Sequence, residues 1–227
     1  MTRLSWSSLV PISQSHLLSI GVASLADGTT NFVHRLPLTC VLIAFLLNKQ
    51  PVVGVTYDPS QDELFYAIQG RGAYLVRRGN GDPSPTRLAV STTTTLDRAV
   101  VSMDAGYGRT VDTVDRYLQL QRALLLQNIR HVRVLGVCGI TMAYVAAGRL
   151  DACLEQGSWS GGTSSGTGPK IWDLAAGKLL VQEAGGVTRD ITKQETKDES
   201  LNLLERSLFC AATPELADAL LATIFSA

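Results

Sequence analysis

The sequence lacks a net charge, because its 20 lysines and arginines balance its 20 aspartates and glutamates. It therefore carries no overall field that would attract nucleic acid or an acidic membrane surface. Charged residues make up only 18% of the chain and hydrophobic residues 45%, a balance that excludes a disordered chain and indicates a globular one. At 227 residues the chain suits one large domain or two closely packed halves.

Long apolar runs and paired cysteines are also missing. No apolar stretch reaches the ~18 residues that span a bilayer, and the first two dozen residues make a poor signal peptide. These absences predict no membrane partner, no nucleic-acid partner and a cytoplasmic location, where thiols stay reduced. The cysteines are scattered, without the spacing of a zinc site or a disulfide framework: Cys40, Cys138, Cys153 and Cys210.

The order of apolar runs and turns divides the chain in two. Between residues 38 and 76, short apolar runs alternate with tight turns, which predicts an antiparallel meander. Its first run, Leu38 to Phe45, predicts a strand buried on both faces. Beyond residue 95, strand-like runs alternate with helical spacing, as in Val111 to Leu126. We therefore expect an α/β layered sandwich, with an antiparallel sheet half followed by an α/β half.

The most informative segment is Asp27-Gly28-Thr29-Thr30-Asn31-Phe32-Val33-His34. An Asp-Gly pair is commonly a solvated turn, and that interpretation is sufficient for the segment taken alone. A functional interpretation also exists. An aspartate can hold a hard cation, a glycine lets the backbone approach an anion, and the N–H groups that open a helix can bind phosphate.

A second segment, Ile171-Trp172-Asp173-Leu174-Ala175-Ala176-Gly177, is followed by Glu183-Ala184-Gly185-Gly186-Val187. Aspartate is a frequent helix N-cap and Gly-Gly a frequent helix end, so a structural interpretation again fits. Taken together and in this order, however, the two segments resemble the two signatures of the inositol monophosphatase family. The intervening runs Asn48 to Leu75 and Ala143 to Asp151 are also similar to that family.

The resemblance covers Asp27 to the C-terminus and divides the chain into three parts. These are an unmatched segment 1–24, a first-half sheet 25–95 with the Asp-Gly-Thr-Thr motif, and a second α/β half 96–227 with the Trp-Asp motif. The resemblance implies hydrolysis of a phosphate monoester, most of all myo-inositol monophosphate, by water that Mg²⁺ activates. It also implies a homodimer for a complete family member.

Site residues carried over from the family follow its motifs. The resemblance implies that Asp27, Asp173 and the backbone carbonyl of Ala26 are metal ligands. Thr29 and Asp27 are the implied catalytic residues, and the Thr29 hydroxyl orients the water. Glu155 matches the acid that hydrogen-bonds the sugar hydroxyls. The full set of implied substrate contacts is Gly28, Thr29, Thr30, Gly136, Val137, Cys138, Glu155 and Asp173.

The chain departs from the family at its first signature. That signature begins Asp-Pro-Ile/Leu-Asp-Gly-Thr, whereas here the matching residues are Ser24-Leu25-Ala26-Asp27-Gly28-Thr29. The aspartate that bridges two metals in the family is thus Ser24. The family also has a Gly-Glu-Glu motif upstream, whereas no Asp or Glu precedes Asp27. A Gly/Ser-rich insertion, Gly157 to Gly168, is expected to be a surface loop.

These departures leave several alternatives open. The chain is an active inositol phosphatase, a related phosphatase for a nucleotide bisphosphate or another sugar phosphate, or a catalytically impaired or incomplete family member. A further alternative is that its first residues come from a gene-model error. We also expect that Asp27 and Asp173 converge on a shared cation and that residues 1–23 form no part of the core sheet.

Overall fold

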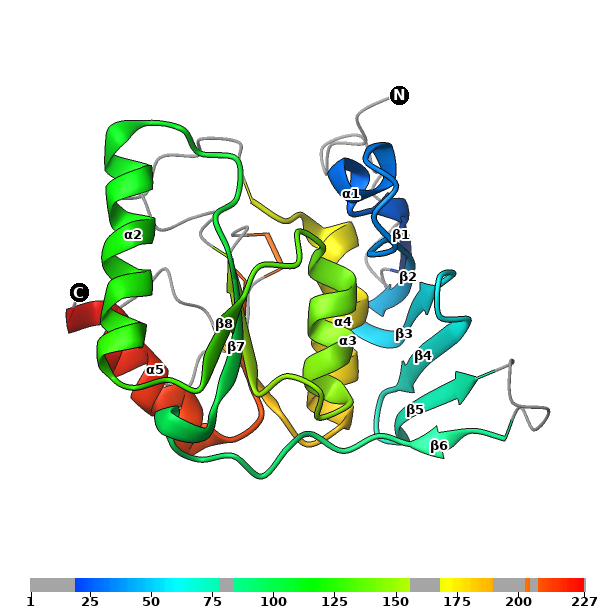
Figure 1. Ribbon diagram of the computed structural model, residues 1–227. Helices are drawn as coiled ribbons and strands as arrows, with labels where there is room; N and C mark the ends of the chain where they lie inside the picture. Colours follow the sequence, from blue (N-terminus) through cyan, green and yellow to red (C-terminus); the bar gives the residue numbers. More distant parts are fainter. Residues whose placement is uncertain (1–18, 78–83, 156–167, 190–202, 205–207, 227) are drawn as a thin grey trace.

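The first half of the chain folds into one antiparallel sheet. The computed structural model describes residues 19–77, 84–155, 168–189, 203–204 and 208–226. The sheet has six strands in sequence order (Figure 1). Its first two-residue turn holds Asn48 and Lys49 at positive φ, 49° and 66°, as a tight hairpin requires. The strands are β1 (Ser19–Asp27), β2 (Cys40–Leu47), β3 (Gln50–Asp58), β4 (Glu63–Ile68), β5 (Gly72–Arg77) and β6 (Thr86–Arg87).

Strand β2 is buried on one face only. Leu42 and Leu46 are fully buried, whereas Ile43 is 51% and Phe45 41% exposed. The prediction of a strand buried on both faces is therefore wrong. The run is apolar on both faces of the strand, which suggests burial on both. In an antiparallel sheet connected by hairpins, however, helices need to cover one face only.

Strand β1 corrects a second expectation. Residues 19–23 pair with β2 in antiparallel register, from Ser19 opposite Leu47 to Ala23 opposite Ile43. The prediction that residues 1–23 lie outside the sheet is wrong for these five, and residues 1–18 lie outside the described part. Side chains of β1 are exposed or half-buried, so its place rests on backbone hydrogen bonds that leave no apolar pattern in the sequence.

The second half forms a mixed sheet with the strand order β10-β11-β9-β7-β8. Strand β7 runs parallel to both β8 and β9, whereas β11 is antiparallel to its neighbours β9 and β10. The carboxyl ends of β7 and β9 therefore point the same way, toward the start of helix α1 (Thr29–Val33). The strands are β7 (Val100–Asp104), β8 (His131–Arg133), β9 (Ala152–Glu155), β10 (Val187–Thr188) and β11 (Leu208–Ala211).

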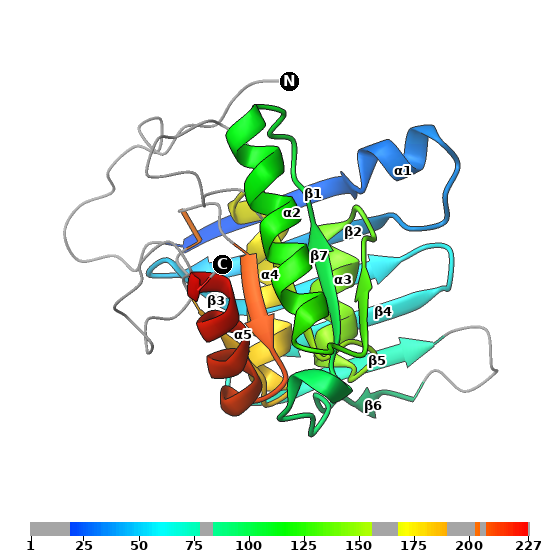
Figure 2. The same ribbon diagram turned by 60° about the vertical axis from the view of Figure 1, so that its left-hand side comes forward.

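The longer helices complete a layered sandwich (Figures 1 and 2). Helices α3 (Cys138–Ala146) and α4 (Ile171–Glu183) lie between the two sheets. Helices α2 (Val111–Leu126) and α5 (Pro214–Ser226) pack on the other face of the mixed sheet, and a short 3-10 helix, η2 (Leu96–Arg98), precedes β7. The expected α/β layered sandwich is thus confirmed. No described helix is both long and apolar enough to cross a membrane.

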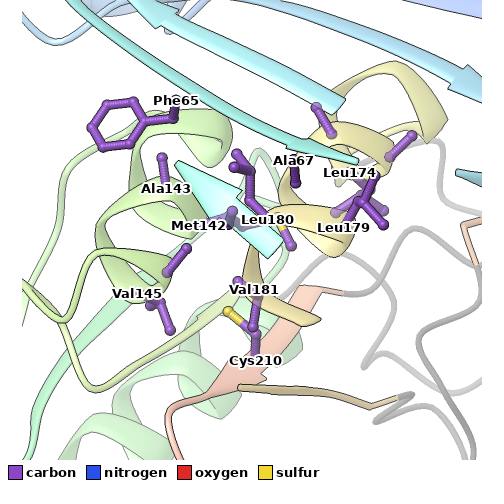
Figure 3. Close-up of a cluster of buried hydrophobic side chains, with 14 of the residues drawn as sticks. Phe65, Ala67, Met142, Ala143, Val145, Leu174, Leu179, Leu180, Val181 and Cys210 are labelled. Atoms are coloured by element: carbon purple, nitrogen blue, oxygen red, sulfur yellow. The ribbon is translucent and has the colours of Figure 1, made fainter. Parts of the chain in front are cut away.

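The main core lies where α3 and α4 meet the antiparallel sheet. Leu174 and Leu180 of α4 pack there with Met142 of α3 and Phe65 of β4 (Figure 3). Helix α4 lies so close to β3 that a Cβ added to Gly54 on β3 would lie 2.9 Å from the carbonyl oxygen of Ala176 on α4. This tight packing fixes the start of α4, and with it Asp173, relative to the sheet that carries Asp27.

Candidate active site

A pocket of about 460 Å³ opens where the first sheet, the carboxyl ends of β7 and β9, and the first turns of α1, α3 and α4 meet. Ligands of α/β proteins commonly bind at such strand ends. The fold brings every predicted site residue to this one pocket, although the sequence separates them widely. Its lining includes Ala26, Asp27, Gly28, Thr29, Thr30, Gly136, Val137, Cys138, Glu155 and Asp173.

Asp27 ends β1 and is held by backbone donors on both oxygens. Its Oδ1 accepts the Gly28 N–H at 2.9 Å, and its Oδ2 accepts the Gly139 N–H at 2.6 Å. The thiol of Cys40 lies 3.7 Å from the same Oδ2. Gly139 belongs to the first turn of α3, whose own N-cap, Val137, has no side-chain hydrogen bond. The Asp27 carboxylate, at the end of β1, therefore caps the N-terminus of α3. The helix dipole favours a negative charge at that end.

Gly28 gives the chain the turn that joins β1 to α1. Its φ is +79°, in the left-handed region. A Cβ there would lie 2.6 Å from the backbone oxygen of Leu38, so no other residue fits without a shift of the backbone. The Gly28 N–H, which the family resemblance assigns to phosphate, is donated to Asp27 in this structure.

We expect Gly28→Ala to destabilise the protein well beyond the cost of the left-handed backbone alone. The matched control is Gly70→Ala, because Gly70 has a φ of +72° but open space around its Cβ position. The control should cost about 1–2 kcal/mol, and Gly28→Ala should lower the thermal midpoint by a further ~5 °C or more. Thermal unfolding of both variants measures the difference. Equal losses would show that the contact with Leu38 relaxes freely.

Asp173 is the third residue of α4. Its Oδ2 accepts the backbone N–H of Lys170 at 3.0 Å, so Asp173 is the N3 residue of a capping box and Lys170, rather than the aspartate, is the N-cap. Burial raises the pKa of Asp173, although hydrogen bonds from the Lys170 N–H and from the Ser24 hydroxyl partly oppose this shift. Ser24 lines the pocket too. The structure thus places a neutral hydroxyl beside Asp173 at the position where the family signature has its first aspartate.

Asp104 is a site residue that the sequence analysis missed. It ends β7, opposite Glu155 at the end of β9, and its Oδ1 accepts the Gly136 N–H at 2.9 Å. Asp104 therefore positions the start of the segment that the resemblance assigns to the sugar ring. An acidic residue directly after an apolar strand, within an α/β half, is the signal that predicts such a position.

Asn31 also holds this segment, through its side-chain amide. Its side-chain amide is buried and donates to the carbonyl oxygens of Leu38 at 3.0 Å and Leu135 at 2.8 Å. A weaker contact reaches the Gly136 oxygen at 3.5 Å. Asn31 thus has a structural role, because its side chain ties α1 to the loop before α3.

Most of the ionisable side chains that line the pocket are carboxyl groups, namely Asp27, Asp104, Glu155 and Asp173. Burial, reinforced by the nearby charge of Asp173, raises the pKa of Asp27 to about 6 despite its backbone hydrogen bonds. Burial, with the charges of Asp104, Asp27 and Asp173, raises the pKa of Glu155 to about 8. Arg109 contributes the positive side chain of the lining, and its guanidinium also donates to the Gly108 oxygen at 2.7 Å. Clustered carboxylates of this kind favour a bound cation.

The pocket offers ligands of the right kind for a hard divalent cation, but few of them. Asp27 and Asp173 offer carboxylate oxygens, the ligands that Mg²⁺ prefers. Within the described residues, no group of three or more His, Cys, Asp and Glu side chains is arranged to hold a metal. Asp27 and Asp173 thus share the lining of one pocket, where their carboxylates are the candidate ligands for a cation.

A model of the inositol monophosphatase family matches residues 26–226. The chain belongs to the inositol monophosphatase family. It is 39% identical over 178 residues to an inositol monophosphatase of Dictyostelium discoideum, which covers 78% of this chain and 58% of that protein. It is 41% identical over 170 residues to inositol monophosphatase 2 of Solanum lycopersicum, or 74% of this chain and 57% of that protein. The chain thus spans less than two thirds of the length of these curated relatives.

Solved structures of the family share the fold. The inositol monophosphatase of Anabaena (Nostoc) sp. PCC 7120 superposes with a TM-score of 0.72 at 28% identity, over 92% of this chain and 72% of that one. Family members of this kind are metal-dependent phosphatases. The layered sandwich is therefore the fold of a phosphatase family.

Proposed function

We propose that the pocket hydrolyses a phosphate monoester, with myo-inositol monophosphate as the preferred substrate and Mg²⁺ as the metal. The observation that carries this proposal is the convergence of the two family motifs. Asp27 with its following helix start, and Asp173 with Glu155, line one acidic pocket. The similarity to proteins named inositol monophosphatase supports the choice of substrate.

The phosphate would bind at the start of α1. The N–H groups in the first turn of a helix have no acceptor within the helix and attract anions. Thr29 and Thr30 supply such groups beside Asp27. The Thr29 hydroxyl would orient the attacking water. Gly28 can join this cradle only if its N–H leaves Asp27, to which it is donated at 2.9 Å.

The sugar would lie against the segment that Asp104 and Asn31 hold. Gly136, Val137 and Cys138 line that side of the pocket, with Glu155 next to Asp104. Burial raises the pKa of Glu155 to about 8, so its carboxyl group is mostly protonated at neutral pH when no cation is bound. It can then donate a hydrogen bond to a sugar hydroxyl as well as accept one.

Mg²⁺ would be held by the Asp27 and Asp173 carboxylates with the Ala26 carbonyl. When bound, it would supply the positive charge that neutralises the phosphate and lowers the pKa of the attacking water. Ser24 limits this arrangement, because a hydroxyl replaces the charged bridging ligand. This observation favours a second candidate, a catalytically impaired family member that still binds its ligands.

We also propose a homodimer and a cytoplasmic location. Helix α2 exposes an apolar stripe at helical spacing that a second chain would cover: Val111, Val114, Leu118 and Leu125. Cysteines that are unpaired in the described part of the structure support a reducing compartment.

The test measures Mg²⁺-dependent phosphate release from inositol 1-phosphate, with a nucleotide 3′,5′-bisphosphate and glycerol phosphate for comparison. We expect Asp173→Asn to remove the Mg²⁺-dependent part and to weaken Mg²⁺ binding by calorimetry at least ~10-fold, because it deletes one of two charged ligands. The matched control is Asp112→Asn, which removes an exposed aspartate from the first turn of α2. The proposal fails if both variants behave alike, and the substrate choice fails if another ester is preferred.

A further inference from the structure

Two buried cysteines lie on neighbouring strands of the mixed sheet, and neither of them lines the pocket. Cys153 of β9 is directly opposite Cys210 of β11 in antiparallel register. Their sulfur atoms lie 2.9 Å apart, and both residues are 0% exposed. The sequence gives no hint of this pair, because 56 residues separate the two positions.

We propose that Cys153 and Cys210 form a site of reversible oxidation, in which the two thiols become one intramolecular disulfide. Directly opposed residues of antiparallel strands have Cα atoms about 4.5–5.5 Å apart. That separation lies inside the range of about 4.4–6.8 Å that a disulfide bridges. The sulfur atoms need to approach by less than ~1 Å to reach a bond length of ~2.05 Å, so the strands can stay paired.

The remaining cysteines have different surroundings. The Cys40 thiol donates to Asp27, and the Cys138 thiol donates to the backbone oxygen of Asp173, each at 3.7 Å. The thiols of Cys153 and Cys210 instead contact each other, within the core between α3, α4 and the mixed sheet. Cys210 lies beside Val181 of α4 in this core (Figure 3). Close approach of two thiols thus singles out this pair among the cysteines.

The oxidation balances with hydrogen peroxide as the oxidant. One thiol sulfur attacks a peroxide oxygen and breaks the O–O bond, which gives a sulfenic acid and one water molecule. The second thiol sulfur attacks the sulfenic sulfur, which forms the S–S bond and releases a second water molecule. Two thiols are oxidised and one peroxide is reduced. Burial raises the pKa of the Cys153 thiol, so the first step is slow at neutral pH.

The cross-link would tie β9 to β11 beside the pocket. Strand β9 ends at Glu155, two positions after Cys153, and the closed loop contains the whole of α4. Such a loop restricts the unfolded chain more than the folded one. The oxidised protein should therefore unfold about 5–10 °C above the reduced protein.

Peptide mapping tests the proposal directly. The native protein is treated with hydrogen peroxide for hours, unfolded with N-ethylmaleimide, and digested with trypsin without reduction. Each cysteine lies in its own tryptic peptide, because Arg149, Lys170 and Arg206 separate the relevant segments. We expect residues 150–170 linked to residues 207–227, at a mass two hydrogen atoms below their sum. Dithiothreitol should release the two peptides and return the thermal midpoint to its starting value.

Two variants keep the result interpretable. Cys210→Ser should lose both the linked peptide and the rise in thermal midpoint, whereas Cys40→Ser should keep the linkage. Mapping of the wild-type chain decides the question even if Cys210→Ser does not fold. The proposal is overturned if peroxide leaves all the thiols reactive with N-ethylmaleimide, if Cys40 links to Cys138 instead, or if Cys153 and Cys210 are oxidised without becoming linked.

Discussion

Expressed as the 227-residue chain, the protein is expected to release phosphate from inositol 1-phosphate at least ~1000-fold more slowly than a family member that carries the first signature with both of its aspartates. The reason is the metal site. Ser24 provides a neutral hydroxyl beside Asp173, and no three metal-ligating side chains converge within the described residues. Loss of charged ligands costs several kcal/mol of transition-state stabilisation, and each 1.36 kcal/mol is about tenfold in rate.

The measurement is phosphate release in millimolar Mg²⁺, with Asp173→Asn as the blank. Ser24→Asp should recover less than ~10-fold, because residues 1–23 contain no acid that adds a further ligand. Ser24→Asn is its matched control, equal in shape but without the charge. A wild-type turnover near ~10 per second, an ordinary enzyme value, would contradict the prediction and show that another residue completes the site.

Glu155→Gln is expected to stabilise the metal-free protein at alkaline pH. The pKa of Glu155 is about 8 in the folded protein, against a usual value of 4.5. The folded state therefore binds the proton more tightly than the unfolded chain, so stability is fully present below about pH 4.5 and is lost as pH rises through 8. The buried charge costs several kcal/mol above pH 8, and glutamine removes that cost while it keeps the shape.

Thermal unfolding in EDTA from pH 5 to pH 9 measures this effect. Above pH 7 Asp27, with its pKa of about 6, is mostly ionised, so the fall in stability between pH 7 and pH 8 should be due mainly to Glu155. Glu155→Gln should flatten that part of the curve and raise the thermal midpoint at pH 9 by ~5 °C or more. Glu215→Gln, at an exposed position in the first turn of α5, should leave the curve unchanged. An unaltered slope in Glu155→Gln would mean that the group is solvated in the folded protein.

The strands and helices followed the local sequence pattern closely. Helix α2 spans Val111–Leu126, and strands β2 to β5 form an antiparallel meander, as the spacing of apolar residues and turns predicts. Strand β1 did not follow such a pattern. It is an edge strand with little burial, so its place depends on backbone pairing with β2 rather than on its own side chains.

The motifs in the sequence identified the residues of the site that belong to them, whereas a pocket residue outside any motif was not predicted. All the residues carried over from the family resemblance line one pocket, but their catalytic and binding roles stay predictions. Asp104 belongs to no sequence motif. It lies in the site because β7 and β9 are parallel and their carboxyl ends are adjacent. Asn31 lies inside a motif, yet its contacts are with the backbone of Leu38 and Leu135. Hydrogen bonds over such separations cannot be deduced from local spacing.

The sequence by itself determined the family and the alternation of strands and helices beyond residue 38, because these depend on residue identity and local period. Its resemblance to the family also predicts that Ser24 stands where the first signature has an aspartate. Only the tertiary structure decided which groups face one another. It brought Ser24 to Asp173, placed Asp104 opposite Glu155, and set Cys153 against Cys210. These contacts arise from sheet register and layer packing, which the whole chain determines together rather than any one segment.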